Sequence, residues 1–235
     1  MEIKVKSLLD GAKEAAGLTV MIDVFRAFTT AAYVMNNNAD RIMPVGGVEN
    51  SFRIKKENPD YILMGERKGV KIDGFDYGNS PHAIRDVDFT GKTVILTTSA
   101  GTQGIVNAEN ADEIILGNFV CMKAIIGYIR KSDSRVVTLV PLGHFGMVKN
   151  DEDEMCASYM KKSLEGREPD FNEVKECIRA SKSGSRFFDD TKPEFPQEDF
   201  ELSMDLNRFD FVLKVMKTDE GERIIKKVEV SELTS

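Results

Sequence analysis

The sequence has few of the residues on which several common active sites depend. Its 235 residues include two histidines and three cysteines. With only His82 and His144, a metal site built on several histidines is hard to assemble. Cys121, Cys156 and Cys177 show no CxxC spacing, and none has an arginine six positions later. The sequence therefore predicts no zinc site, no disulfide framework and no cysteine-phosphatase loop, and it favours reduced thiols in a cytoplasmic protein.

Excess positive charge and long apolar runs are also missing. The 32 Lys and Arg residues oppose 39 Asp and Glu residues, for a net charge of −7, which argues against a nucleic-acid-binding surface. No apolar run approaches the length of a membrane span, and residues 1–17 lack the apolar core of a signal peptide. We therefore expect neither nucleic acid nor membrane as a partner.

Three familiar phosphate-binding patterns are absent as well. Neither GxGxxG nor GxxxxGK[ST] occurs, so the sequence supports neither a dinucleotide-binding fold nor a P-loop. Phe25 stands where a haloacid-dehalogenase phosphatase would carry its second acid, which argues against that class.

Short apolar runs alternate with helical patterns. We expect strands at residues 18–24, 41–45, 61–64, 92–98, 113–116 and 136–141. We expect helices at residues 27–38, 49–57, from 102, 120–131 and 151–164. This alternation predicts an α/β fold, a three-layer α/β/α arrangement with a mostly parallel or mixed sheet.

The last third of the chain has a different pattern. A helix is expected at residues 171–181, and residues 184–200, with Pro193 and Pro196, are interpreted as an irregular excursion. Residues 211–216 and 223–230 predict a C-terminal β-hairpin. The chain is interpreted as a single domain over residues 1–235, with a subdivision near residue 110 as the alternative.

Polar segments follow several of the predicted strands. Residues 23–30 (DVFRAFTT), 65–81 (GERKGVKIDGFDYGNSP) and 97–102 (TTSAGT) each come after an apolar run. Ligands of open α/β sheets bind beyond the carboxyl ends of the strands. If the strands are parallel, these segments meet at one edge and form an active site.

The first segment combines an acid with a helix start. Asp23 is either only a helix N-cap, which Asp favours, or a cap that is also part of a ligand site. Arg26, Thr29 and Thr30 would lie in the first turns of the helix, where free N–H groups attract anions. Arg26 adds a bidentate partner for phosphate or sulfonate.

The other polar segments offer further candidates. Small and hydroxyl residues at 97–102 resemble a phosphate cradle of backbone N–H groups and hydroxyls. In the loop at 65–81, Glu66 offers a metal-binding oxygen and Arg67 an anion-binding fork, although a solvated surface loop is the plain alternative. Glu152 and Asp153 either complement a helix dipole or reach toward a divalent cation. His82 and His144 are interpreted as loop histidines without a catalytic role.

Taken in order, these segments resemble those of the 2-phosphosulfolactate phosphatase family, the ComB-type proteins of coenzyme M biosynthesis and their bacterial relatives. The resemblance lies in DVFRAFTT, GERKGVKIDGFDYGNSP, LTTSAGTQG and DEDE. Phe28, Ser99-Ala100 and the PLG after residue 140 depart from the family pattern at the expected substrate pocket. The resemblance implies Mg²⁺-dependent hydrolysis of 2-phosphosulfolactate, or a related small phosphorylated hydroxy acid, to the hydroxy acid and phosphate. It also implies a homodimer as the family habit.

The site residues follow from the segments and the resemblance together. The expected catalytic residues are Asp23, Arg26, Glu66 and Arg67. The expected substrate-binding residues are Thr29, Thr30, Lys71, Asn79, Ser80, Thr97, Thr98, Ser99, Gly101 and Thr102. The expected metal ligands are drawn from Asp23, Glu66, Asp76, Glu152 and Asp153.

Two points stay open at this stage. The nucleophile is either a carboxylate such as Asp23 or a metal-bound water. The alternatives to a phosphatase are a non-catalytic binding protein for small phosphorylated or sulfonated acids, and a lyase on the same scaffold. We expect Arg26→Ala and Glu66→Gln each to lower activity about tenfold or more with little change in thermal stability.

Overall fold

The computed structural model describes residues 1–230, and its strands form one ten-stranded sheet. The strand order is β1-β8-β2-β7-β9-β10-β3-β6-β4-β5. A first set of parallel strands comprises β1 (Glu2–Val5), β8 (Val136–Pro141), β2 (Gly17–Ile22) and β7 (Ala111–Gly117). A second parallel set comprises β3 (Arg41–Pro44), β6 (Thr93–Thr97) and β4 (Ile62–Arg67), with the short antiparallel β5 (Val70–Lys71) at the edge.

The C-terminal hairpin joins these two sets. Its strands are β9 (Phe211–Lys217) and β10 (Arg223–Glu229). β9 pairs antiparallel with β7, and β10 pairs antiparallel with β3 through Ile225 and Ile42. The predicted hairpin is confirmed, but it lies in the middle of the sheet.

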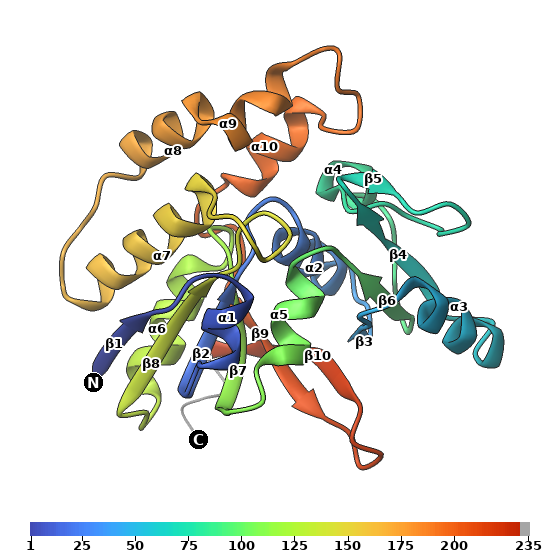
Figure 1. Ribbon diagram of the computed structural model, residues 1–235, viewed down its shortest axis with the longest axis horizontal. Helices are drawn as coiled ribbons and strands as arrows, with labels where there is room; N and C mark the ends of the chain where they lie inside the picture. Colours follow the sequence, from blue (N-terminus) through green and yellow to red (C-terminus); the bar gives the residue numbers. More distant parts are fainter. Residues whose placement is uncertain (231–235) are drawn as a thin grey trace.

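Helices cover the sheet in the predicted α/β arrangement. α1 (Leu8–Lys13) packs against α5 (Gly101–Asn107), and α6 (Met122–Lys131) packs against α7 (Asp151–Leu164). In Figure 1, α1 and α5 lie in front of the strands and α6 lies behind them. The second strand set carries α2 (Ala27–Asn36) and α3 (Val48–Glu57), and the short α4 (Pro81–Ile84) contacts α2.

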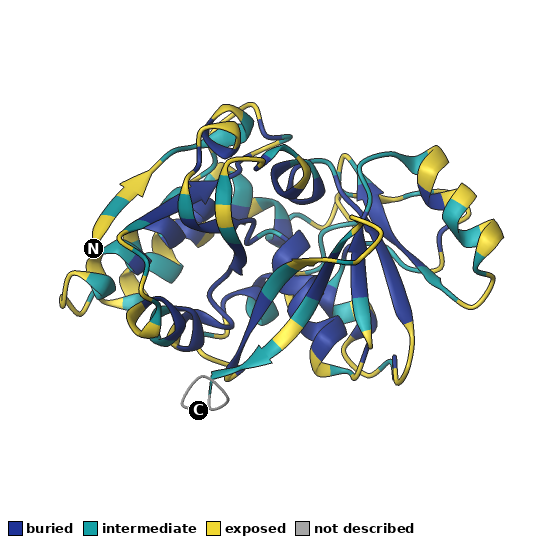
Figure 2. Ribbon diagram, turned by 90° about the horizontal axis from the view of Figure 1, so that it is seen from below, coloured by how far each residue is buried: buried dark blue, intermediate teal, exposed yellow. Residues whose placement is uncertain are grey.

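The central strands are apolar because both of their faces are covered. Every residue of β6 is buried, as is every residue of β2 and β8 except the first. Such continuous apolar runs are typical of parallel strands between two helical layers. Figure 2 shows these buried strands inside a shell of exposed helix faces. One hydrophobic cluster includes residues from both sides of residue 110, such as Val20 and Leu139.

Residues 171–203 form a helical layer beyond the strand ends, which we call the cap. It contains α8 (Phe171–Ala180), α9 (Lys182–Ser185), a 3₁₀ turn (Arg186–Phe188) and α10 (Gln197–Ser203). Figure 1 shows α8, α9 and α10 side by side at the top of the molecule. The prediction of an irregular excursion at residues 184–200 is therefore wrong in part. Its helices are too short to show a clear apolar period, and Pro196 stands at the N-cap of α10, where proline does not break a helix.

Within residues 1–230, the helices are too short or too polar for any of them to span a bilayer.

Candidate active site

A small cavity of about 70 Å³ lies where β2, β4, β6 and β8 end. Asp23 follows β2, Glu66 lies at the end of β4, Ser99 follows β6, and Gly143 follows β8, and all four line the cavity. The cap contributes residues to the opposite wall. The expectation that polar segments meet beyond the strand ends is therefore confirmed, although the strands belong to two separate parallel sets.

Asp23 lies at the base of this cavity and is buried. Its Oδ1 accepts a hydrogen bond from the Ala27 N–H at 3.1 Å, so it contacts the start of α2 although Arg26 is the N-cap. Burial, followed by the nearby charge of Asp153, raises the pKa of Asp23 well above its ordinary value. The side chain thus supports a helix start and also faces the cavity.

Glu66 is held in one orientation by three donors. Its Oε1 accepts from the Ser99 N–H at 2.7 Å, and its Oε2 accepts from the Gly69 N–H at 2.7 Å and the Ser99 hydroxyl at 3.2 Å. These bonds join the ends of β4 and β6 to the β4–β5 turn. Because the carboxylate is buried and held in place, it is preorganised as a ligand for a cation.

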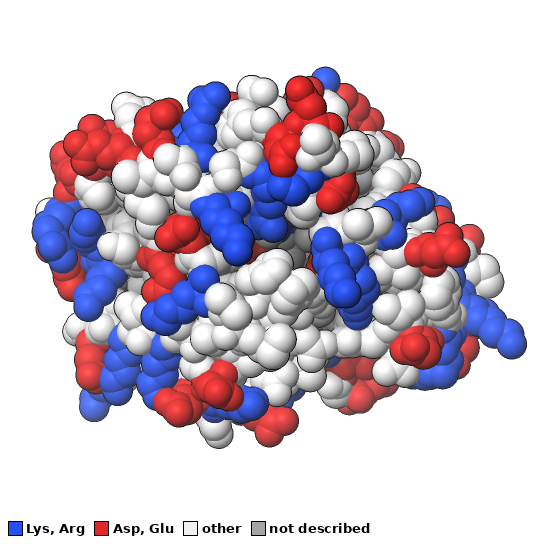
Figure 3. All heavy atoms as spheres, turned by 45° about the horizontal axis from the view of Figure 1, so that its top comes forward, with Lys and Arg blue, Asp and Glu red and all other residues white. Residues whose placement is uncertain are grey.

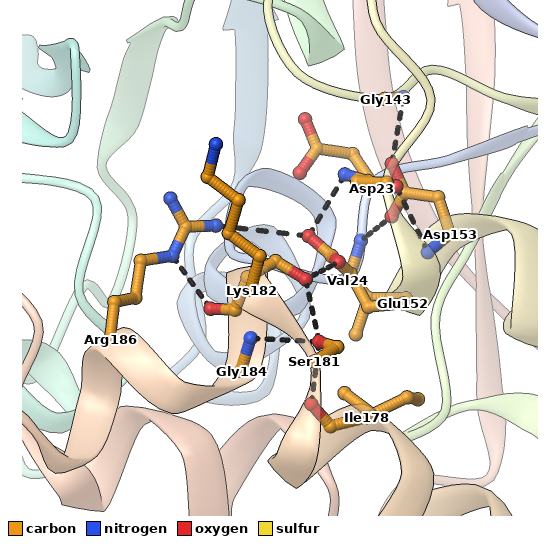
Figure 4. A network of polar contacts seen from close by, with 12 residues as sticks. Asp23, Val24, Gly143, Glu152, Asp153, Ile178, Ser181, Lys182, Gly184 and Arg186 are labelled. Atoms are coloured by element: carbon orange, nitrogen blue, oxygen red, sulfur yellow. Dashed lines mark hydrogen bonds and ion pairs between the residues drawn. The ribbon is translucent and has the colours of Figure 1, made fainter.

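Glu152 and Asp153 lie in the first turn of α7, close to Asp23 (Figure 4). Asp153 accepts from the Val24 N–H at 2.8 Å and the Gly143 N–H at 2.9 Å, and so it ties together the ends of β2 and β8. Burial raises the pKa of Asp153 to about 6 and that of Glu152 to about 8. Glu152 accepts from the Ser183 hydroxyl and from Asn150. Neither side chain lines the cavity, and their service as metal ligands stays a prediction.

Arg26 is buried and its terminal nitrogens are already paired. Its Nη1 lies 2.6 Å from Asp199 Oδ2 and 2.8 Å from Glu194 O, and its Nη2 lies 3.0 Å from Gly69 O. Asp199 is fully buried. The guanidinium lines the cavity and also joins the β4–β5 turn to the cap. Its expected role as a phosphate clamp stays a prediction.

Three other predicted residues lie away from the cavity. Arg67 donates to the carbonyl of Glu66, and the Lys71 ammonium donates to Phe75 O at 3.0 Å. Asp76 is partly exposed, and its Oδ2 accepts from the Leu63 N–H at 2.8 Å. None of Arg67, Lys71 and Asp76 lines the cavity. Their hydrogen bonds hold the shape of this loop within the fold, and a contact with substrate or metal stays a prediction.

The predicted hydroxyl groups bond mostly within the protein. Thr98 and Thr102 cap each other's backbone N–H groups, at 3.1 and 3.2 Å. The Thr97 hydroxyl lies 2.7 Å from Ser51 Oγ, and Thr29 donates to Val24 O. The Thr30 hydroxyl is buried and has no hydrogen-bond partner within residues 1–230. Of the hydroxyl residues expected to bind substrate, Ser99 lines the cavity.

Glycine is required at the start of α5. A Cβ on Gly101 would lie 3.0 Å from Asp23 Oδ2 and 2.9 Å from Ala27 Cβ. Side chains rarely approach this closely, so the glycine lets α5 begin directly beside Asp23. A role in substrate binding stays a prediction.

Asn79 and Ser80 have different surroundings. Asn79 is buried, lines the cavity, and leaves its Oδ1 without a hydrogen-bond partner in the described residues. Ser80 donates to Asp199 Oδ1 at 2.8 Å and caps α4. An unpaired buried oxygen is costly unless a ligand or water satisfies it, so Asn79 is the stronger candidate for contact with a ligand.

The cavity wall also contains residues that are not among those predicted from the sequence, and Arg186, His144 and Phe195 are three of them. Arg186 lies close enough to Glu152, Asp153 and Asp23 for their negative charges to act on its guanidinium. Burial lowers the pKa of Arg186. The centre of the Phe195 ring lies 4.9 Å from the guanidinium carbon of Arg26 and 4.7 Å from that of Arg186. Arg186 and Phe195 come from the segment interpreted as irregular, and no local motif marks them.

His144 lies in a loop, as predicted, but that loop reaches the site. The residue follows β8 and lines the cavity, and its pKa is lowered by burial and then by Arg186. Neutral imidazole is therefore favoured at pH 7, and it can exchange a proton with a bound group.

The oxygen donors that line the cavity fit a divalent cation that also binds ligands from outside the protein. Asp23 and Glu66 supply carboxylates to the cavity and Asn79 supplies a free oxygen. Mutual repulsion among carboxylates contributes to the raised pKa of Asp23, and a bound cation would relieve it. Within residues 1–230 no three acidic, histidine or cysteine side chains converge as a closed metal site. This open set suits Mg²⁺, which typically binds one or two carboxylates together with water and substrate phosphate.

Comparisons with known proteins point to one family. A sequence profile described as 2-phosphosulpholactate phosphatase matches residues 4–218. A probable 2-phosphosulfolactate phosphatase of Bacillus subtilis is 34% identical over 216 residues, which cover 89% of this chain and 93% of that protein. Proteins of the same description from Clostridium acetobutylicum (37% identical, 60% of each chain) and Thermoplasma acidophilum (34% identical, 67% of this chain and 70% of the relative) also match. The profile and the B. subtilis protein span nearly the whole fold described above, and the chain therefore belongs to the 2-phosphosulpholactate phosphatase family.

Proposed function

We propose that this protein hydrolyses 2-phosphosulfolactate, or a close phosphorylated hydroxy acid, to sulfolactate and phosphate, with Mg²⁺ as cofactor. The observation that carries the proposal is the meeting of Asp23, Glu66 and Arg186 around one small cavity in a member of this family. Two carboxylates and a guanidinium are the groups that a metal-assisted reaction of a phosphate ester requires.

Each side chain has a distinct part in this proposal. Asp23, Glu66 and Asn79 hold the cation, which when bound neutralises charge on the phosphoryl oxygens. Arg186 binds a second phosphoryl oxygen from the cap side. Asp153 positions the site, because its bonds to Val24 and Gly143 fix the strand ends on which Asp23 and His144 are mounted.

Hydrolysis forms one bond to phosphorus and breaks another. An oxygen nucleophile attacks phosphorus, and the bond from phosphorus to the ester oxygen breaks. The attacking water gives up a proton and the leaving alkoxide takes one, and neutral His144, which lines the cavity, can accept the first and deliver the second. The nucleophile is either water or the Asp23 carboxylate. Acid quenching during a single turnover, followed by mass analysis of the peptide that carries Asp23, distinguishes them, because only the covalent route forms a phospho-aspartyl enzyme.

Phosphate release from 2-phosphosulfolactate, measured with Mg²⁺ and with EDTA, tests the proposal. We expect release with Mg²⁺ and at least a hundredfold slower release with EDTA. Stabilisation by sulfolactate without any turnover would support a binding protein. A product other than sulfolactate and phosphate would support a lyase. Either result would overturn the proposal.

A further inference from the structure

A larger cavity, which we call the outer cavity, adjoins the small one, which we call the inner cavity. Its volume is about 530 Å³, and it shares Lys68, His144, Phe145, Asn150, Arg186 and Phe195 with the small cavity. The inner cavity of about 70 Å³ is small against the ~300–1,000 Å³ of most ligand pockets. A phosphorylated acid whose phosphoryl group lies inside must therefore extend its remaining groups into the outer cavity.

The outer cavity is positively charged although the protein is acidic overall. Its cationic lining residues are Lys68, Lys149, Lys182, Arg186 and Lys192, against the acids Asp151 and Glu194. Figure 3 shows Lys and Arg side chains gathered around a hollow near the middle of the face it displays. In a chain with a net charge of −7, such a local excess of cations favours an anionic ligand.

Two of these cations have no acidic partner. Lys149 pairs with Glu154 at 3.1 Å, and Lys192 pairs with Asp189. The ammonium groups of Lys68 and Lys182, in contrast, make no ion pair or hydrogen bond with any residue between 1 and 230. Their charges are therefore available to a ligand in the outer cavity.

The backbones that carry both lysines are fixed to the active site. Lys68 stands in the β4–β5 turn with a left-handed φ of 56°, and the Gly69 N–H beside it donates to Glu66. Lys182 begins α9, and the next residue, Ser183, donates to Glu152. One lysine thus belongs to the sheet side and the other to the cap, and Arg186 lies with them on the cavity wall.

We propose that Lys68 and Lys182 bind the second strong anion of the substrate, the sulfonate or an equivalent acid group that is not hydrolysed. This assignment rests on the proposed function, which places the phosphoryl group in the inner cavity. It makes the enzyme selective for phosphorylated acids that carry a further anion, and it assigns this selectivity to two residues outside the predicted site.

Binding of sulfolactate and of inorganic phosphate, each measured by calorimetry with Mg²⁺, tests the proposal without any need for turnover. The variants are Lys68→Met, Lys182→Met and the double variant, with Lys192→Met as the matched control from the same cavity wall. We expect each of the first two changes to weaken sulfolactate binding about tenfold, the size of one charge-assisted hydrogen bond. Phosphate binding should change less than threefold, and Lys192→Met should leave both affinities within twofold.

Kinetics add a second comparison. In the double variant, kcat/KM for 2-phosphosulfolactate should fall about a hundredfold, while kcat/KM for p-nitrophenyl phosphate should change less than threefold. Equal losses for both ligands, an equal effect of Lys192→Met, or no binding of sulfolactate by the unaltered protein would each overturn the assignment. If sulfolactate binds through the lysines but no ester is hydrolysed, the subsite stands and the proposed phosphatase function fails.

Discussion

Replacing Arg26 with alanine removes the cation beside a fully buried carboxylate. Arg26 Nη1 lies 2.6 Å from Asp199, and the two side chains are 4% and 0% exposed. After the change, Asp199 keeps the hydroxyl of Ser80 and the N–H of His82 but has lost its counter-charge. Breaking a buried ion pair in this way typically costs about 3–5 kcal/mol of folding free energy.

The expected loss is large enough to measure by heat or urea. For a chain of this size, about 1 kcal/mol shifts the Tm by roughly 2–4 °C, so Arg26→Ala should lower it by roughly 6–20 °C. The sequence alone predicts little change in stability, because it assigns Arg26 only to the substrate. The bonds from Arg26 to Glu194 O and Gly69 O are the reason for the revision.

Two controls separate the ion pair from a general effect of losing an arginine. Arg67→Ala, which removes a bond only to a neighbouring carbonyl, should cost less than about 1 kcal/mol. Arg26→Ala combined with Asp199→Asn removes both charges and should be more stable than Arg26→Ala alone. A Tm for Arg26→Ala within 2 °C of the unaltered protein, or no recovery in the double variant, would refute this reasoning.

Three further predictions concern residues in and around the candidate site. Burial raises the pKa of Glu152 from 4.5 to about 8 and that of Asp153 from 3.8 to about 6, so their contribution to stability is complete only below about pH 4 and is lost as the pH rises toward 8. Without divalent cations, urea unfolding should show falling stability from pH 5 to pH 8.5, and Glu152→Gln should flatten this slope; an unchanged slope would show that ionisation of Glu152 is not its cause. Glu66→Gln should lower kcat/KM at least tenfold and stability by about 1–2 kcal/mol, because the new amide group would face the N–H of Ser99 or Gly69; full activity would remove Glu66 from the site. Gly69→Ala should cost at least about 1 kcal/mol in thermal unfolding, because Gly69 has a φ of +85° and a Cβ would overlap the Phe195 ring; a neutral result would show that the cap can shift.

Much of the fold could be predicted from local patterns. β8 and α7 have the predicted bounds. The apolar run of residues 136–141 begins after the polar segment of residues 132–135 and ends at Pro141, and the acidic first turn of α7 follows the capping residue Asn150. The position of β9 and β10 between two parallel sets could not be predicted, because pairing between distant strands leaves no periodic signal in either of them.

In the candidate site as well, some residues could be predicted from local sequence patterns and others could not. Asp23 and Glu66 could be located because each comes at the end of a buried strand. Arg186 could not, because it is brought to the cavity by a short turn whose position depends on the whole cap. The hydroxyls of Thr98 and Thr102 each accept a hydrogen bond from the other's backbone N–H, and a sequence does not show which groups are already paired within the fold.

The central hairpin also affects how the chain can be made. β7 and β3 obtain their second partners from β9 and β10, which leave the ribosome after the other strands of residues 1–230. Until then a nascent chain exposes two unpaired strand edges, which are templates for aggregation. The bond between Arg26 and Asp199 likewise joins residues 173 positions apart. During synthesis, the active site therefore cannot become complete before Asp199 has left the ribosome.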